Sequence, residues 1–428
     1  MIEIIQSNGS LEKECVENLK DRSDEVQQEV YNIVETILRD VKNHGDEALA
    51  DYTKRFDGVD ISDFLVTEAE INAALDNVEK EFIEALNIAK NNIWFYHEKQ
   101  KQKSWLITKE DGVILGQNIR ALQNVGIYVP GGTAAYPSSV LMNAIPAKVA
   151  GVENLVMVTP PSKDGTVNPN ILAAAKVAGV DKIYKIGGAQ AIAALAYGTK
   201  TIEKVDKIVG PGNIYVATAK RSVFGHVDID MIAGPSEILV IADEKANARF
   251  IAADLMSQAE HDVLSSAILV TNSMELAHEV REELNLQVQN MSRKEIIQSS
   301  IEDYGAIIVT EDIKSCIKIA NDIAPEHLEL MVEEPMRYLG EIKNAGSIFL
   351  GQYAPEPLGD YIAGPNHVLP TSGTARFFSP LSVDSFIKKS SFLHYTEEAF
   401  NKIGSAAIKL AETEGLTAHA NSIRVRLE

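Results

Sequence analysis

The amino-acid sequence predicts an α/β protein built on parallel sheets. Three observations support this fold class: β-branched runs recur from about residue 125, Ala-rich helical stretches separate them, and glycine turns follow most of the runs. Strand, turn and helix repeated in this order produce right-handed crossovers and a parallel sheet covered by helices on both faces. There are too many such units for one compact sheet. The sequence therefore predicts two Rossmann-like modules, with helical segments at both ends of the chain.

The N-terminal part of the chain is helical in pattern. Residues 10–57 are charged and have a helical period, and a cleaner helix is predicted to start at Thr67, where TEAE has the spacing of a capping box. Apolar residues then recur at helical intervals as far as Phe95. This part of the chain should supply helices before the first sheet begins.

The strands are predicted in the middle of the chain. The segments expected to form a strand and its turn are GIYVPGG, NLVMVTPP, KIYKIGG, KIVGPGN, EILVIAD, SAILVT, GAIIVT and GSIFLG. The last ~50 residues lack such runs and are predicted to be helical, with Gly415 as a helix stop. The predicted domains are an N-terminal arm (1–25), a first α/β domain (26–128 and 238–377), a second α/β domain (129–237) and a C-terminal helical tail (378–428).

Composition excludes several classes of function. The chain has 428 residues and a formal net charge of −21, so its surface should repel nucleic acid and anionic lipid. The N-terminus lacks a signal-peptide core and no apolar run approaches the ~18 residues of a membrane span, so a cytoplasmic protein is expected. Cys15 and Cys316 form no CxxC motif, so ligands for any metal should be His, Asp, Glu or Gln.

Ligands of such folds bind at the carboxyl ends of the strands, which points to the loops after residues 129, 187, 210 and 233. As bare patterns, GGAQ and GPGN fit tight turns equally well. The sequence contains no GxGxxG, P-loop or HExxH motif, and GPGNIY lacks the third glycine. Spacing alone therefore does not indicate NAD.

The histidines are more informative. His44, His97 and His278 fall in charged helices and are expected at the surface, whereas four others have unusual neighbours. His261 shares a helical face with Gln258, His327 follows Glu326, His367 shares a Gly/Pro-rich loop with Asp360, and His419 follows Glu414 by five residues. Any one of them alone fits a structural role better than a functional one.

Together these residues match a zinc site. The candidate ligands offer two imidazoles, one carboxylate and one amide oxygen: Gln258, His261, Asp360 and His419. Glu326 and His327 would remain free for proton transfer. Two other functions stay open at this point, a metal-dependent hydrolase on a doubly wound fold and a non-catalytic, two-lobed metabolite-binding protein.

A family resemblance covers nearly the whole chain. It rests on ordered stretches that include IYVPGG, GGAQAIAALAYGT, VDKIVGPGN, AGPSEILVIAD, DLMSQAEHD, PEHLEL, AGSIFLG, GDYIAGPNHVLPT and LTAHANSIRVR. In these stretches and in their order, the chain resembles the histidinol dehydrogenases. The resemblance implies an aldehyde-dehydrogenase-like fold, an intertwined homodimer, and one zinc ion per subunit. The implied reaction oxidises L-histidinol through L-histidinal to L-histidine with two NAD, at the end of histidine biosynthesis.

The resemblance also implies roles for individual residues. Glu326 and His327 match the catalytic pair, and the zinc ligands match Gln258, His261 and Asp360, with His419 donated by the partner. The implied substrate contacts are Ser236, Gln258, His261, His327, Asp360, His367, Glu414 and His419. The implied NAD contacts are Tyr128, Gln190 and Asn213. The first α/β domain would then carry the zinc and catalytic residues, and the second would bind NAD.

Overall fold

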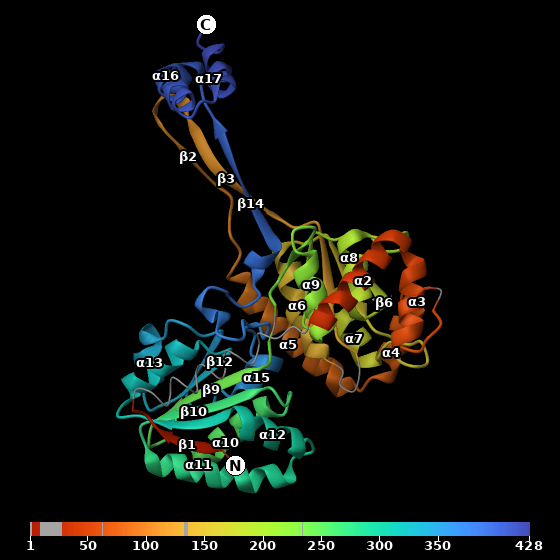
Figure 1. The fold of residues 1–428 in the computed structure, drawn as a ribbon, viewed down its shortest axis with the longest axis vertical. Coiled ribbons are helices and arrows are strands. Elements are labelled where there is room, and N and C mark those ends of the chain that lie inside the picture. The colour runs from red at the N-terminus through yellow and green to blue at the C-terminus, as the bar shows by residue number, and fades with distance from the viewer. Residues whose placement is uncertain (1, 9–27, 62, 132–135, 233) are drawn as a thin grey trace. The chain divides into compact units, whose positions relative to one another are not determined.

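The computed structural model describes residues 2–8, 28–61, 63–131, 136–232 and 234–428. The chain divides into two compact units, which are Met1–Gln100 with Leu122–Phe386 (unit 1) and Lys101–Ala121 with Ile387–Glu428 (unit 2). Unit 1 contains two parallel sheets whose helices lie between successive strands (Figure 1). The predicted α/β fold class with two parallel-sheet modules is confirmed. Among the described residues, no helix is long and apolar enough to cross a membrane.

The first sheet of unit 1 has five parallel strands in the order β6-β5-β4-β7-β8. Its strands are β4 (Asn124–Tyr128), β5 (Asn154–Thr159), β6 (Lys182–Lys185), β7 (Lys207–Val209) and β8 (Asp228–Ile229). The intervening helices are α6 (Pro137–Ala150), α7 (Pro169–Ala178), α8 (Gly188–Tyr197) and α9 (Ile214–Val223). The first four predicted strand segments are confirmed here, and the glycine turns that follow three of them start α8, α9 and the loop before α6.

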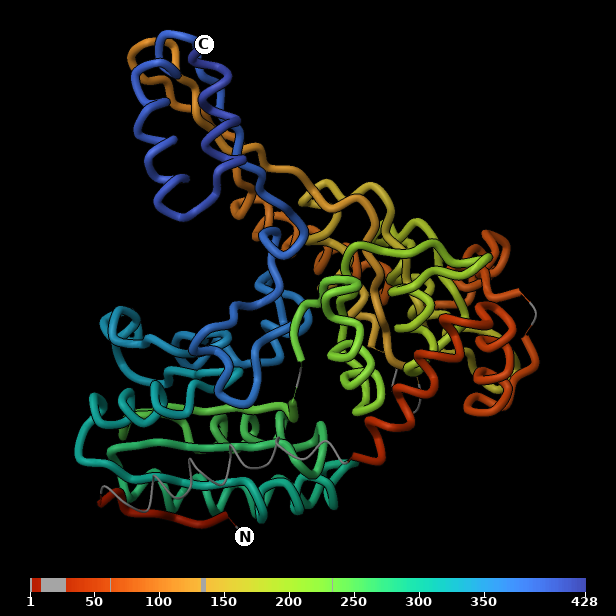
Figure 2. Tube along the Cα trace, turned by 45° about the horizontal axis from the view of Figure 1, so that its top comes forward, coloured from red at the N-terminus to blue at the C-terminus, as the bar shows by residue number. Residues whose placement is uncertain are grey.

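The second sheet has six parallel strands in the order β1-β11-β10-β9-β12-β13. Its strands are β1 (Glu3–Gln6), β9 (Glu237–Ala242), β10 (Ser266–Thr271), β11 (Gly305–Val309), β12 (His327–Met331) and β13 (Ser347–Leu350). Its helices are α10 (Ala248–Ala259), α11 (Met274–Gln287), α12 (Lys294–Tyr304), α13 (Ile313–Ile323), α14 (Pro335–Tyr338) and α15 (Glu356–Tyr361). The N-terminal strand β1 forms one edge of this sheet (red in Figures 1 and 2). Four predicted strands are confirmed, and β1 and β12 were not predicted.

The N-terminal helices are α2 (Gln28–His44), α3 (Asp46–Phe56), α4 (Glu68–Asn77) and α5 (Lys80–Glu98). The predicted capping box at Thr67 is present, but the helix stops at Val78, whose backbone is extended, and a second helix follows. These helices pack on α6, α7, α8 and α9 of the five-stranded sheet. Residues 26–128 were predicted to form one domain with residues 238–377 instead. An amphipathic pattern shows that a helix has a buried face, but it does not show which sheet the helix packs against.

Unit 2 is an antiparallel sheet in the order β14-β3-β2 with two helices. Its elements are β2 (Trp105–Thr108), β3 (Ile114–Ala121), β14 (Ile387–His394), α16 (Glu397–Thr413) and α17 (Thr417–Arg424). The prediction that 378–428 is wholly helical was wrong, because Ile387–His394 is a strand. Its partner β3 lies far away in the sequence, so no local pattern revealed the pairing. Gly415 follows the end of α16 with a positive φ of 77°, as a helix stop should.

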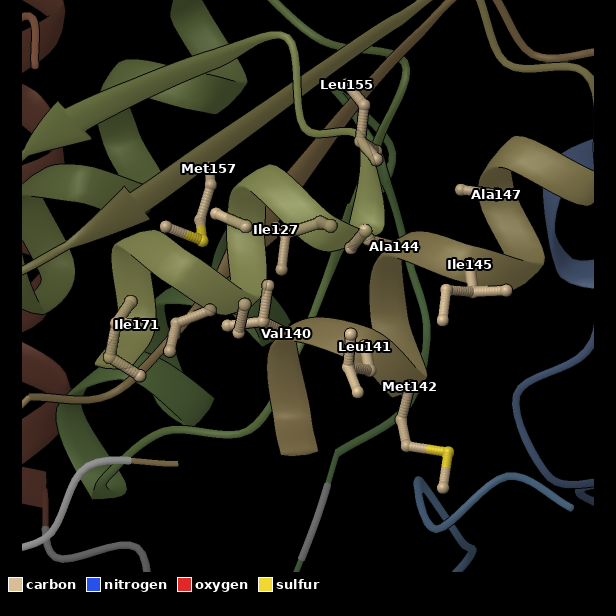
Figure 3. Packing of buried hydrophobic residues seen from close by; sticks show 14 of the residues in the cluster. Ile127, Val140, Leu141, Met142, Ala144, Ile145, Ala147, Leu155, Met157 and Ile171 are labelled. Carbon is tan, nitrogen blue, oxygen red and sulfur yellow. The ribbon is translucent and has the colours of Figure 1, made fainter. Parts of the chain in front are cut away.

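The core of the five-stranded sheet is close-packed. Ile127 of β4, Met157 of β5, Val140 and Leu141 of α6, and Ile171 of α7 belong to one buried cluster (Figure 3). Burying each of these side chains contributes about 1.5–3 kcal/mol. A strand held this firmly fixes its own carboxyl end, which is where ligands of such sheets bind.

Gly210, in the loop after β7, is expected to tolerate no side chain. Its φ is +112°, and a Cβ atom there would lie 2.1 Å from the backbone oxygen of Tyr128. Gly225 is a matched control, because its φ is +99° and a Cβ would meet nothing within 4 Å. We expect Gly225→Ala to lose roughly 1–2 kcal/mol of unfolding free energy through backbone strain. Gly210→Ala should lose clearly more, and equal losses in urea unfolding would contradict the close approach.

Candidate active site

A cavity of about 360 Å³ in unit 1 gathers most of the predicted site residues. It is lined by the loops after β4 and β7, the end of α10, the start of β12 and the segment around α15. The predicted residues that line it are Ser236, Gln258, His261, Glu326, His327, Asp360 and His367. The structure therefore brings together seven residues that are spread over more than a hundred positions of sequence.

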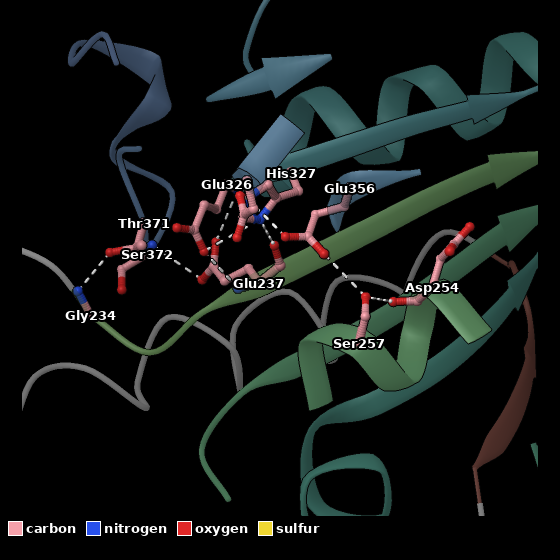
Figure 4. A network of polar contacts seen from close by, with 10 residues as sticks. Gly234, Glu237, Asp254, Ser257, Glu326, His327, Glu356, Thr371 and Ser372 are labelled. Carbon is pink, nitrogen blue, oxygen red and sulfur yellow. Dashed lines mark hydrogen bonds and ion pairs between the residues drawn. The ribbon is translucent and has the colours of Figure 1, made fainter. Parts of the chain in front are cut away.

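Glu326 and His327 are held at the start of β12 by the neighbouring strand β9. The backbone N–H of Glu237 donates to Glu326 Oε2 at 2.9 Å, and His327 Nδ1 lies 2.9 Å from the backbone oxygen of Glu237 (Figure 4). A carbonyl oxygen only accepts, so Nδ1 carries a proton. In the neutral imidazole, Nε2 then has the free lone pair. This is the tautomer that a general base or a metal ligand needs.

His327 Nε2 faces two carboxylates. It lies 3.6 Å from Asp360 Oδ1 and 3.9 Å from Glu356 Oε1, and it makes no hydrogen bond to any described residue. The three side chains could place ligand atoms within 4.8 Å of one another. Glu356 was not predicted, although it stands four residues before Asp360 on α15 and the spacing of one helical turn could have indicated it.

Gln258 lies at the end of α10. Its side chain is buried, and its Oε1 atom has no hydrogen-bond partner among the described residues. A buried amide oxygen without a partner is costly unless a ligand supplies one. His261 is exposed at the same cavity, three residues further on. His367 Nδ1 lies 3.0 Å from the backbone oxygen of Asp360 and therefore tethers the two predicted residues.

The electrostatics of the cavity favour a cation. Burial raises the pKa of Glu326 to about 8, despite the opposing effect of His327. Burial and the Asp360 charge raise the pKa of Glu356 to about 8. Burial would lower the pKa of His327, but Glu326 and Asp360 outweigh it and raise this pKa to about 10. The raised pKa values of Glu326 and Glu356 mean that their charged forms are disfavoured here unless a cation compensates for burial. The oxygen and nitrogen donors present fit a divalent metal ion.

A second cavity, of about 980 Å³, lies at the carboxyl ends of the five-stranded sheet. All three predicted NAD contacts, Tyr128, Gln190 and Asn213, line it. The Tyr128 hydroxyl accepts a hydrogen bond from Gly188 N at 3.1 Å. Asn213 Oδ1 accepts from two backbone N–H groups at the start of α9, so Asn213 also has a structural role as the helix cap.

The two cavities adjoin along two loops. In the first loop, Pro130 lines the smaller cavity and Gly131 lines the larger one. In the second loop, Gly212 lines the smaller cavity and Asn213 lines the larger one. A ligand in the larger cavity can therefore place one end beside the residues of the smaller one. Two adjoining cavities of this kind suit a reaction between a small substrate and a dinucleotide.

Two predicted residues belong to unit 2. Glu414 is the C-terminal cap of α16, and His419 lies in α17. Both side chains are exposed. Within the described part of the chain, all other predicted site residues belong to unit 1.

The comparisons with known proteins agree on one family. The sequence model described as histidinol dehydrogenase matches residues 20–427. The chain is 62% identical to the histidinol dehydrogenase of Clostridium acetobutylicum over 429 residues, which covers 100% of this chain and 99% of that one. It is 59% identical to that of Listeria innocua over 412 residues, covering 96% and 95%. The crystal structure of histidinol dehydrogenase from Elizabethkingia anophelis superimposes with a TM-score of 0.94 at 43% identity, covering 100% and 98%. The chain belongs to the histidinol dehydrogenase family.

Proposed function

We propose that this protein oxidises L-histidinol through L-histidinal to L-histidine and uses two NAD and one zinc ion per subunit. One observation carries the proposal. The Glu326–His327 pair shares a cavity with Gln258, His261 and Asp360, and this cavity adjoins a second one lined by Tyr128, Gln190 and Asn213.

The proposed zinc ligands are Gln258, His261, Asp360 and His419 of the partner subunit. The unpartnered Oε1 of Gln258 supports a ligand at this place, and the raised pKa of the buried Glu356 carboxyl is what a cation there would offset. Ligand atoms of Glu356, His327 and Asp360 lie within 4.8 Å of one another. When bound, zinc would hold the substrate nitrogens and NAD would accept hydride.

The chain itself supplies the proton chemistry. In neutral His327 the Nδ1 proton is held by the backbone oxygen of Glu237, so Nε2 of this form can take the hydroxyl proton of histidinol. The second oxidation needs the aldehyde to be hydrated, and the neighbouring carboxylate of Glu326 is the proposed base for that water.

A cysteine nucleophile is not needed for this route. Cys316 is buried, and burial raises the pKa of its thiol to about 11, so little thiolate would form. It does not line the cavity that holds Glu326 and His327. Cys15 lies outside the described residues.

We also propose that two chains share each site. Unit 2 exposes apolar side chains of β2 and β14, among them Trp105, Leu106, Ile107, Phe392 and Leu393, which a monomer would leave in water. A homodimer that covers this surface would allow Glu414 and His419 of the partner subunit to reach the substrate. Ser236, Gln258, His261, His327, Asp360 and His367 would contact the substrate from the first subunit.

NADH formation tests the function and the metal together. We expect two NADH per L-histidinol from the zinc-loaded protein, loss of activity after thorough chelation, and recovery when zinc is restored. Absence of NADH from the zinc-loaded protein would contradict the dehydrogenase and favour a hydrolase or a binding protein. Full activity after chelation, with zinc content measured as zero, would keep the dehydrogenase and overturn the metal site.

A further inference from the structure

Glu237, which the sequence did not predict, contacts both residues of the catalytic pair. It is the first residue of β9, it is buried, and its backbone already holds the catalytic pair, through N–H to Glu326 and through the carbonyl oxygen to His327. Its carboxyl group also accepts from backbone N–H groups of the described residues. Oε2 accepts from Glu326 N at 3.3 Å and Oε1 accepts from Ser372 N at 3.1 Å (Figure 4).

We propose that the Glu237 side chain is a positioning residue, which sets the places of Glu326 and His327 by tying the start of β12 to the loop at Thr371 and Ser372. This inference rests on the proposed function. Glu237 does not line the cavity, so it acts through the pair and not on the substrate.

The loop that Glu237 holds is under constraint. Ser372 has a φ of 56°, in the left-handed region that residues other than glycine rarely adopt. Thr371 Oγ1 accepts from Gly234 N at 2.6 Å, and a Cβ on Gly234 would lie 2.3 Å from Ser372 Oγ. The segment before β9, which includes the proposed substrate contact Ser236, is thus packed tightly against this loop. Glu237 links both segments to the catalytic pair.

The chemistry requires a carboxylate of full length. Both oxygens of Glu237 accept from backbone N–H groups, and a glutamine has only one acceptor oxygen. In Glu237→Gln, the amide nitrogen would face either Glu326 N or Ser372 N, which are both donors. In Glu237→Asp, two acceptors remain, but the side chain is one methylene too short to reach both donors. Each variant should therefore lose one of the two contacts.

We expect Glu237→Gln and Glu237→Asp to lower kcat for histidinol oxidation and for histidinal oxidation by similar factors, about 10–100-fold. The Kd for NAD should stay within about 2-fold, because the proposed NAD contacts belong to the other sheet. Ser300→Ala is the matched control. It removes a buried hydrogen bond to Ser265 O in the same half of unit 1, and it should change Tm but not kcat. Unchanged kcat in both Glu237 variants, or a loss no larger than that of Ser300→Ala at equal Tm, would overturn the proposal.

A second measurement does not depend on turnover. In ¹⁵N-histidine NMR, with His327→Asn as the assignment variant, the ring resonances of His327 should shift between the wild type and Glu237→Gln, because the side chain of Glu237 positions the backbone oxygen beside Nδ1. An unchanged His327 signal would overturn the positioning role. If the wild type forms no NADH from histidinol, the proposed function fails, and the NMR comparison still decides whether Glu237 positions His327.

Discussion

Glu326→Gln is expected to slow histidinal oxidation by about 10²–10⁴-fold, the usual contribution of a general base, and to leave histidinol oxidation within a few fold. The first oxidation needs a base for the substrate hydroxyl, which is His327. Only the second oxidation requires a water molecule to be activated. Glutamine has nearly the shape of glutamate and keeps an oxygen to accept from Glu237 N, so the place of the side chain should be preserved.

The same substitution should change the pH dependence of the first oxidation. The Glu326 charge is one cause of the raised pKa of His327, so removing it should lower that pKa. A general base is active in its unprotonated form, which is present above its pKa. The variant should therefore keep its rate of histidinol oxidation to lower pH than the wild type does.

The two steps are separated by supplying either histidinol or histidinal with NAD and following NADH in a single turnover. Glu279→Gln, an exposed residue of α11, is the control for the substitution itself and should affect neither step. Equal losses in both oxidations would contradict a separate role for Glu326. A pH profile of histidinol oxidation that moves upward would contradict its charge effect on His327.

The sequence predicted strands well where glycine turns and β-branched runs coincide, as at GIYVPGG and SAILVT. It missed β12, because HLELM begins with the catalytic histidine and contains Glu329, a polar residue that looks unsuited to a buried strand. Glu329 is buried because it accepts from Glu356 N at 2.7 Å, a partner supplied by α15. Long-range pairing of this kind has no local pattern.

In the candidate site, too, local spacing was predictable from the sequence and long-range proximity was not. Spacing alone predicted that Gln258 and His261 share a helical face, but α10 ends at Ala259 and His261 lies just beyond it. Their common cavity with Asp360 and Glu326 follows from the fold. Glu237 and Glu356 were missed, since single acids beside a strand or on a short helix are common. The expectation that His97 is at the surface was wrong. It is buried, and its Nδ1 lies 2.8 Å from Ile93 O, so the backbone satisfies it inside a charged helix.

Mixed dimers should recover activity if each site takes residues from two chains. Chains carrying Glu326→Gln and chains carrying His419→Asn are each expected to form nearly inactive homodimers for the full reaction. In a dimer with one chain of each kind, one site has both substitutions and the other has neither. A heterodimer purified with two different tags should therefore show about half of the wild-type activity per dimer.

The reverse combination gives the decisive control. A heterodimer of a wild-type chain and a chain carrying both substitutions has one substitution in each shared site, so it should be nearly inactive. If each site were built from one chain, the outcomes would exchange: the wild-type chain would keep about half of the activity and the first heterodimer would have none. His419 is exposed in unit 2, as a residue that reaches a partner's site would be. The two heterodimers together distinguish a site shared between chains from a site within one chain, and no structure of the dimer is needed.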